Sequence, residues 1–128
     1  MLHQVDPYFI AFYNMKTLLK LEELALFILG IIAFTTLNLS WWWFPLLLLT
    51  PDIGMLGYLK STKVGAMTYN LCHHRGIAIA LFVIGFYLDS FGMLLAGVIL
   101  FSHIAFDRML GYGLKYPDNF KNTHLGNI

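Results

Sequence analysis

Charged side chains are scarce in this sequence: only 12% of its 128 residues are Asp, Glu, Lys or Arg, and 59% are hydrophobic. Soluble domains usually carry about 25% charged residues. A soluble chain of this length has too little volume to bury so much apolar surface. We therefore expect a lipid bilayer to surround the chain, and we expect a single transmembrane domain over residues 1–128.

Cysteine is almost missing as well. A single cysteine, Cys72, excludes an internal disulfide, so the fold does not depend on disulfide bonds. The net charge of +1 does not indicate a nucleic-acid partner, and we expect none.

Four apolar stretches are present, and each is long enough to cross about 30 Å of hydrocarbon as a helix. Lipid offers no hydrogen bonds to an open backbone, so helix is the structure we expect. The expected helices cover residues 16–37, 41–60, 64–88 and 90–110, and a polar tail covers 111–128. Short turns after the first and third segments favour antiparallel neighbours. The expected fold is an all-α, integral membrane four-helix bundle.

One face of this expected bundle lacks positive charge. The Lys and Arg residues at the other face are Lys16, Lys20, Lys60, Lys63, Arg108, Lys115 and Lys121. Positive charge collects on the cytoplasmic side of membrane proteins, so both termini are expected in the cytoplasm. Trp41, Trp42 and Trp43 then lie at the opposite interface, where aromatic rings are favoured.

The second and fourth segments end in similar sequences. Residues 52–60 read DIGMLGYLK, and residues 107–115 read DRMLGYGLK. One interpretation is two duplicated helical hairpins in the same orientation, which would place Asp52 opposite Asp107. The other is chance similarity between apolar stretches.

Polar side chains inside the apolar segments are the main candidates for function, because lipid makes them costly to bury. His103 and Asp107 are four residues apart, so both lie on one helix face about 5–6 Å from each other. Asp52 follows Pro51, which removes a backbone donor and tends to kink a helix.

The third segment contributes a similar group. Tyr69, Asn70 and His73 share a face by helical spacing, but Asn70 and His74 are also four residues apart. Which of the two histidines points inward therefore stays open.

Two histidines and two aspartates form a plausible site for a divalent ion, with zinc first and manganese or iron as alternatives. The predicted metal ligands are Asp52, His73, His103 and Asp107. The leading hypothesis is a metal-dependent hydrolase that acts on a lipid or another amphiphile at the cytoplasmic side. The predicted supporting residues are Tyr69, Asn70, His74, Arg75 and His124.

Two catalytic roles complete this hypothesis. Glu22 would act as general base on a metal-bound water. Arg108 or Arg75 would hold a phosphate or a developing oxyanion.

Three other functions fit the same residues. A small proton-coupled transporter would use Glu22 or Glu23 and act as a homodimer. A haem protein would ligate iron through His73 and His103. A purely structural protein would use the polar groups only to hold its helices together.

The tail, residues 111–128, allows two arrangements. Tyr116, Phe120 and Leu125 could pack under the bundle and bring His124 to the mouth of the site. Alternatively, the tail is loose and solvated.

The segments LEELALF, LLTPDIGMLGYL, VGAMTYNLCHH and SHIAFDRMLGYGLKYPDNFKNTHLG resemble, in this order, a family of small bacterial integral membrane proteins, the domain of unknown function 4260. The resemblance covers nearly the whole chain from about Leu18. It implies four transmembrane helices in the bacterial inner membrane and no established activity. Its motif residues here are Glu22, Pro51, Asp52, Tyr69, Asn70, His73, His103, Asp107, Arg108, Lys115, Thr123 and His124.

A weaker resemblance is to inner-membrane, metal-dependent hydrolase-like proteins, which pair a Pro-Asp, a His-Arg-Gly and an HxxxD motif on successive helices. The matching positions are 51–52, 74–76 and 103–107. The sequence departs from that pattern twice. Gly54 stands where a second acid is expected, and residues 77–80, IAIA, replace a Thr-His-Ser. These departures do not fit a site for two metal ions.

Overall fold

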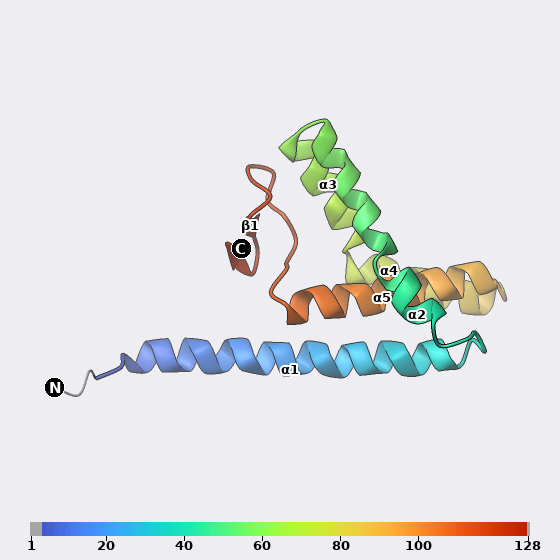
Figure 1. Ribbon diagram of the computed structural model, residues 1–128, viewed down its shortest axis with the longest axis horizontal. Helices are drawn as coiled ribbons and strands as arrows, with labels where there is room; N and C mark the ends of the chain where they lie inside the picture. The colour runs from blue at the N-terminus through green and yellow to red at the C-terminus, as the bar shows by residue number, and fades with distance from the viewer. Residues whose placement is uncertain (1–3, 128) are drawn as a thin grey trace.

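The computed structural model describes residues 4–127, and these residues are mostly helical (Figure 1). The helices are α1 (Pro7–Thr35), α2 (Trp43–Leu48), the 3-10 helix η1 (Thr50–Leu59), α3 (Thr62–Cys72), α4 (Arg75–Tyr87) and α5 (Phe91–Met109). Two short strands, β1 (Asn122–Thr123) and β2 (Gly126–Asn127), pair antiparallel near the C-terminus. The prediction of a mainly helical fold is confirmed.

The second and third expected helices are each broken, so the structure does not form a simple bundle of four continuous helices. Residues 41–60 divide into α2 and η1 beside Pro51, which has no backbone N–H. Residues 64–88 divide into α3 and α4 at His73 and His74. His74 has an extended backbone, and its Nδ1 accepts from the N–H of Ile77 at 3.3 Å, which caps α4.

The first and fourth expected helices are continuous. α1 begins at Pro7, before the expected start at residue 16, because Asp6 caps it by accepting from the N–H of Tyr8 at 2.9 Å. α5 begins after Ser90, whose hydroxyl accepts from the N–H of Met93. The two helices lie side by side in Figure 1.

The apolar core lies where α1, α2, α4 and α5 meet. Phe34, Val98 and Ile99 are buried there. Gly30 allows α1 to approach α5 closely, because a Cβ at this position would collide with the hydroxyl of Ser102. This contact holds α5 firmly along α1, and α5 carries two of the four predicted ligands.

η1 and α3 form a second pair, which rises away from α1 and α5 (Figure 1). Gly65 lies under the ring of Tyr58, and the hydroxyl of Thr68 donates to the carbonyl of Gly54 at 2.6 Å. The base of this pair meets α5, so Asp52 and His73 are brought against that helix.

Within residues 4–127, one helix, α5, is long and apolar enough to cross a membrane. The stretches Trp43–Leu59 and Arg75–Tyr87 are apolar but shorter. The structure therefore does not support the expected topology of four separate spans. Two breaks shorten the second and third expected helices, and α1, although long, carries Lys20, Glu22 and Glu23 in its last 18 residues.

Candidate metal centre

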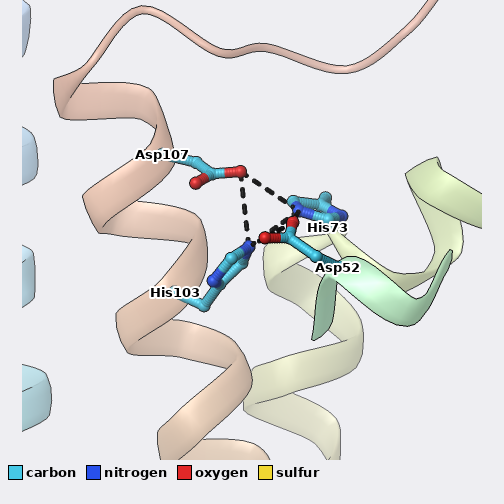
Figure 2. A group of neighbouring side chains, drawn as sticks. All are labelled: Asp52, His73, His103 and Asp107. Atoms are coloured by element: carbon cyan, nitrogen blue, oxygen red, sulfur yellow. Dashed lines mark hydrogen bonds and ion pairs between the residues drawn. The ribbon is translucent and has the colours of Figure 1, made fainter. Parts of the chain in front are cut away.

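Four predicted ligands meet at one point in the structure (Figure 2), and we call them the quartet: Asp52, His73, His103 and Asp107. One ligand atom from each lies within 4.8 Å of all the others. Asp52 comes from η1, His73 from the end of α3, and the other two from α5. The sequence prediction that these residues come together is confirmed.

The two imidazole rings face each other through their Nε2 atoms, which are 2.9 Å apart. The Nε2 of His103 lies 3.1 Å from Asp52 Oδ1 and 3.3 Å from Asp107 Oδ2. The Nε2 of His73 lies 3.1 Å from Asp107 Oδ2 and 3.5 Å from Asp52 Oδ1. Both carboxylates therefore face both rings.

A free backbone carbonyl orients His103. Pro51 has no N–H, so in the 3-10 turn that follows α2 it cannot donate to the carbonyl of Leu48. The next N–H, that of Asp52, bonds to Leu49 instead, at 3.2 Å. The carbonyl of Leu48 is then available, and it lies 2.6 Å from His103 Nδ1.

His73 is oriented in a similar way at the end of α3. A last-turn carbonyl of a helix has no partner further along the helix. The N–H of His73 bonds to Asn70 at 3.2 Å rather than to Tyr69. The carbonyl of Tyr69 instead lies 2.9 Å from His73 Nδ1.

These two contacts fix the protonation of both rings. A carbonyl oxygen only accepts, so each Nδ1 must carry a proton and donate it. In neutral imidazole the Nε2 is then an acceptor with a lone pair. Two lone pairs that face each other at 2.9 Å repel, and a cation between them removes the repulsion.

Charge balance favours a divalent cation over a single shared proton. Asp52 and Asp107 together bring two negative charges beside two neutral rings. One proton would leave a net negative charge in a partly buried site, which is unfavourable. A divalent ion neutralises both carboxylates.

The spacing of the ligand atoms also suits a small ion. Metal–nitrogen and metal–oxygen bonds of about 2.0–2.1 Å place neighbouring ligands about 3.3 Å apart in a tetrahedron. The separations that involve a histidine, from 2.9 to 3.5 Å, bracket that value, and all four ligand atoms lie within 4.8 Å of one another. The quartet thus has the donor types of a zinc site, and most of its separations suit a small ion.

The quartet is open on one side only. The side chains of His103 and His73 are 0% and 4% exposed, and that of Asp107 is 14% exposed. The side chain of Asp52 is 40% exposed, so solvent reaches the centre from the η1 side.

Tyr69 contacts two members of the quartet. Its hydroxyl donates to Asp107 Oδ2 at 3.2 Å, and its ring stacks on His73 at 3.7 Å. Lys115 is buried, and its Nζ lies 5.0 Å from the centre of the Tyr69 ring. Asn70 holds the backbone of Lys115 by two hydrogen bonds, of 2.7 and 2.9 Å.

The model of one family, described as Domain of unknown function (DUF4260), matches residues 16–128. The chain belongs to this family. No curated protein and no solved structure matches it. The resemblance to metal-dependent hydrolase-like proteins is therefore not shown. The quartet of this DUF4260 protein lies wholly within the matched residues.

The structure decides between the two histidines of the third segment. His73 is 3% exposed and belongs to the quartet. His74 is exposed and caps α4. The sequence could not separate them, because helical spacing assumes a continuous helix and the backbone here leaves the helix at these two residues.

The acids of α1 lie outside the quartet. Glu22 is exposed, and no contact among the described residues brings it to the four ligands. Glu23 forms an ion pair with Arg75, which joins α1 to α4. Arg108 donates from Nη2 to the backbone carbonyl of His73 at 3.3 Å, so it contacts the backbone of a quartet residue.

The distance between the two rings also bears on the haem alternative. Two axial histidines on opposite faces of one iron need Nε2 atoms about 4 Å apart, at metal–nitrogen bonds of about 2 Å. The observed 2.9 Å leaves no room for a haem plane between His73 and His103.

The tail is ordered and packs on the helices. Just after α5, the chain turns at Gly111, which has a positive φ of 95°, and the N–H of Tyr112 donates to the carbonyl of Asp107 at 2.9 Å. Phe120 packs edge-on against Tyr58 of η1 at 5.3 Å, as the packed arrangement requires. Tyr116, in contrast, is 50% exposed.

His124 is held in place by Leu114. The backbone N–H of His124 donates to the Leu114 carbonyl at 3.0 Å. Its ring Nδ1 accepts from the backbone N–H of Leu114 at 2.8 Å. Burial, followed by the positive charge of Arg108, lowers the pKa of His124 below its ordinary 6.5. Burial also lowers the pKa of Lys115.

The internal similarity is only partly reflected in the structure. Asp52 and Asp107 do face each other in the quartet. The residues after them differ in backbone, because 52–59 continue in η1 while the helix after Asp107 ends at Met109. The two segments are therefore not structural repeats.

Two functional contacts were not found from the sequence. The carbonyl of Leu48 orients His103, and a backbone group leaves no signal except Pro51 nearby. The sequence indicates Lys115 only as a motif residue, yet its side chain is buried beside the ring of Tyr69.

Proposed function

We propose that this protein binds one divalent metal ion in the quartet, and that the ion is zinc. The observation that supports it most strongly is the pair of facing Nε2 atoms, 2.9 Å apart, whose Nδ1 partners are both bound to backbone carbonyls. Zinc favours four nitrogen and oxygen donors in a tetrahedron. Manganese and iron accept the same donor types.

The ion would serve hydrolysis of a lipid or another amphiphile. Zinc lowers the pKa of a bound water to about 7, so a hydroxide is present at neutral pH. Four protein ligands fill a tetrahedron, so a water would enter as a fifth ligand beside Asp52, the exposed member of the quartet. We assign Asp52 the role of proton acceptor in place of Glu22, because Glu22 is exposed on α1.

In this reaction the water oxygen forms a bond to the acyl carbon of an ester, and the bond from that carbon to the alkoxide oxygen breaks. The proton of the water would pass to Oδ2 of Asp52, because Oδ1 faces the two rings as the ligand atom. It then goes to the departing alkoxide, which leaves as an alcohol.

A bilayer location is supported by the apolar surface. Many large apolar side chains on α1 and α4 are exposed, among them Leu18, Leu21, Ile28, Ile32, Ile79, Val83 and Phe86. Such a surface indicates contact with lipid or with another protein. In the proposal α5 crosses the inner membrane with α1 packed along it, the end of α5 that carries Asp107 faces the cytoplasm, and η1 and α3 lie near that boundary.

The test of location is extraction. Membranes of a bacterium that expresses the protein would be washed at alkaline pH, and the protein should stay in the pellet until detergent is added. Release into the alkaline wash would contradict membrane insertion.

The test of activity uses detergent-purified protein and fluorogenic glycerol esters with short and long acyl chains. We expect hydrolysis that stops after metal is removed by a chelator and returns with zinc. Asp52→Asn should lower the rate at least 100-fold, whereas Glu22→Gln should change it less than twofold. Equal rates with and without metal would contradict the proposal.

A further inference from the structure

A second polar site lies on the other side of α5, where the end of this helix meets α1 and the tail. It is a pocket of about 410 Å³, within the range of small-molecule sites. α1, the segment 108–111 and the tail hairpin each contribute to its wall. In Figure 1 the tail hairpin lies beside the C-terminal end of α5, and α1 runs along the other side of that helix. The quartet residues do not line this pocket.

The wall contains three positive side chains. Lys16 and Lys20 come from α1, and Arg108 comes from α5. The wall also contains one acid, Glu23, but its carboxylate is already paired with Arg75. The lining residues therefore carry more positive than negative charge, three cations against one acid.

The donors suit a group with several acceptor oxygens. Arg108 uses Nη2 to bind the carbonyl of His73, and its guanidinium carries further N–H groups. His124 accepts at Nδ1 from Leu114, so in its neutral form the proton lies on Nε2, which is then a donor. Together with the two lysines, these groups match a phosphate better than a single carboxylate.

The residues of the pocket wall are far apart in the sequence, and the fold brings them together. Gly111 turns the chain away from α5, and the double hydrogen bond between Leu114 and His124 brings the tail back beside Arg108. Lys16 and Lys20 are one helical turn apart, so both lie on the face of α1 that borders the pocket. Leucines border the same pocket: Leu19, Leu110 and Leu125.

We propose that this pocket binds a phosphate group, and the leucines beside it favour a phosphate attached to an apolar chain, as in an anionic phospholipid. The inference goes beyond the proposed hydrolysis, because phosphate binding here needs no metal ion. Free phosphate offers the same chemistry, so the experiment must separate the two sources.

The experiment measures binding to full-length protein in a neutral detergent by isothermal titration calorimetry. The probes are dihexanoyl phosphatidic acid, inorganic phosphate and dihexanoyl phosphatidylcholine. We expect the first to bind at least tenfold more tightly than the third, whose choline cancels the phosphate charge. Phosphatidic acid tighter than inorganic phosphate identifies a lipid, and equal affinities identify free phosphate.

Matched variants locate the site. Lys16→Gln with Lys20→Gln should weaken binding at least tenfold, because two donors to the phosphate are lost. Lys60→Gln with Lys63→Gln removes the same charge from exposed positions outside the pocket and should change it less than twofold. His103→Ala should keep phosphate binding while it loses the metal, so failure of one site is distinguished from failure of the other.

Three results would overturn the inference. These are no binding of either phosphate probe, equal binding of phosphatidylcholine, or the same loss in the Lys60 and Lys63 variant as in the Lys16 and Lys20 variant.

Discussion

At the scale of single residues, the quartet depends on groups that hold the histidines in one tautomer. Carbonyls of Leu48 and Tyr69 fix the Nδ1 protons, and the Tyr69 hydroxyl binds Asp107. In metal proteins, removal of groups that hold the ligands usually lowers metal affinity by about 10- to 100-fold.

Tyr69→Phe tests this dependence. The variant keeps the ring that stacks on His73 and loses the hydrogen bond to Asp107 Oδ2, so zinc affinity should fall about tenfold. Competition with a zinc-binding dye measures the affinity. Tyr116→Phe, at a half-exposed position, should leave it unchanged, and equal loss in both variants would contradict the role of Tyr69.

The members of the quartet were largely predictable at this scale. Helical spacing related His103 to Asp107 correctly because α5 is continuous. Helical spacing could not choose between His73 and His74, because α3 ends at Cys72 and His74 already caps α4. Asp52 was predicted from its place after Pro51, although the consequence of Pro51 for His103 was not.

At the scale of elements, the breaks in the helices create the site. A continuous second helix would bond the carbonyl of Leu48 internally, and His103 would lose its partner. Hydropathy alone predicts long helices here, because the residues on both sides of each break are apolar. The expected helices are interrupted at Pro51 and at His73–His74, where backbone chemistry outweighs apolar composition.

Pro51→Ala tests the link between η1 and the metal. The new N–H can donate to the carbonyl of Leu48, so His103 Nδ1 loses its acceptor and zinc affinity should fall at least tenfold. Circular dichroism should show equal or greater helix content, which separates this effect from unfolding. Pro45→Ala, near the exposed start of α2, is the matched control. Unchanged zinc affinity in Pro51→Ala would refute the link.

At the scale of the whole molecule, the tail joins the two helix pairs. It follows α5, contacts Tyr58 of η1 through Phe120, and forms one wall of the phosphate pocket. The sequence left its order undecided, since the contacts that hold it, such as Asn70 with the backbone of Lys115, join residues far apart in the chain.

His124 makes the packing of the tail dependent on pH. Its pKa is lowered in the folded protein, so protonation favours the unfolded form. The contribution of His124 to stability is complete above about pH 6.5, the ordinary value for histidine, and declines as the pH falls below it. Thermal unfolding between pH 5 and 8 measures this.

The matched variant is His124→Gln, which does not titrate. The difference in Tm between the native chain and this variant should shrink as the pH falls below 6.5. A difference that stays constant over the whole range would contradict the prediction.

The central claim is that the quartet holds one metal ion, and the most direct measurement is the zinc content of the purified protein by elemental analysis. We expect about one zinc per chain in the native protein and in His74→Ala, whose histidine caps α4 outside the quartet. His103→Ala should contain less than about a tenth as much. Native protein without stoichiometric metal after growth with zinc, manganese and iron, or equal metal in His103→Ala, would contradict the claim.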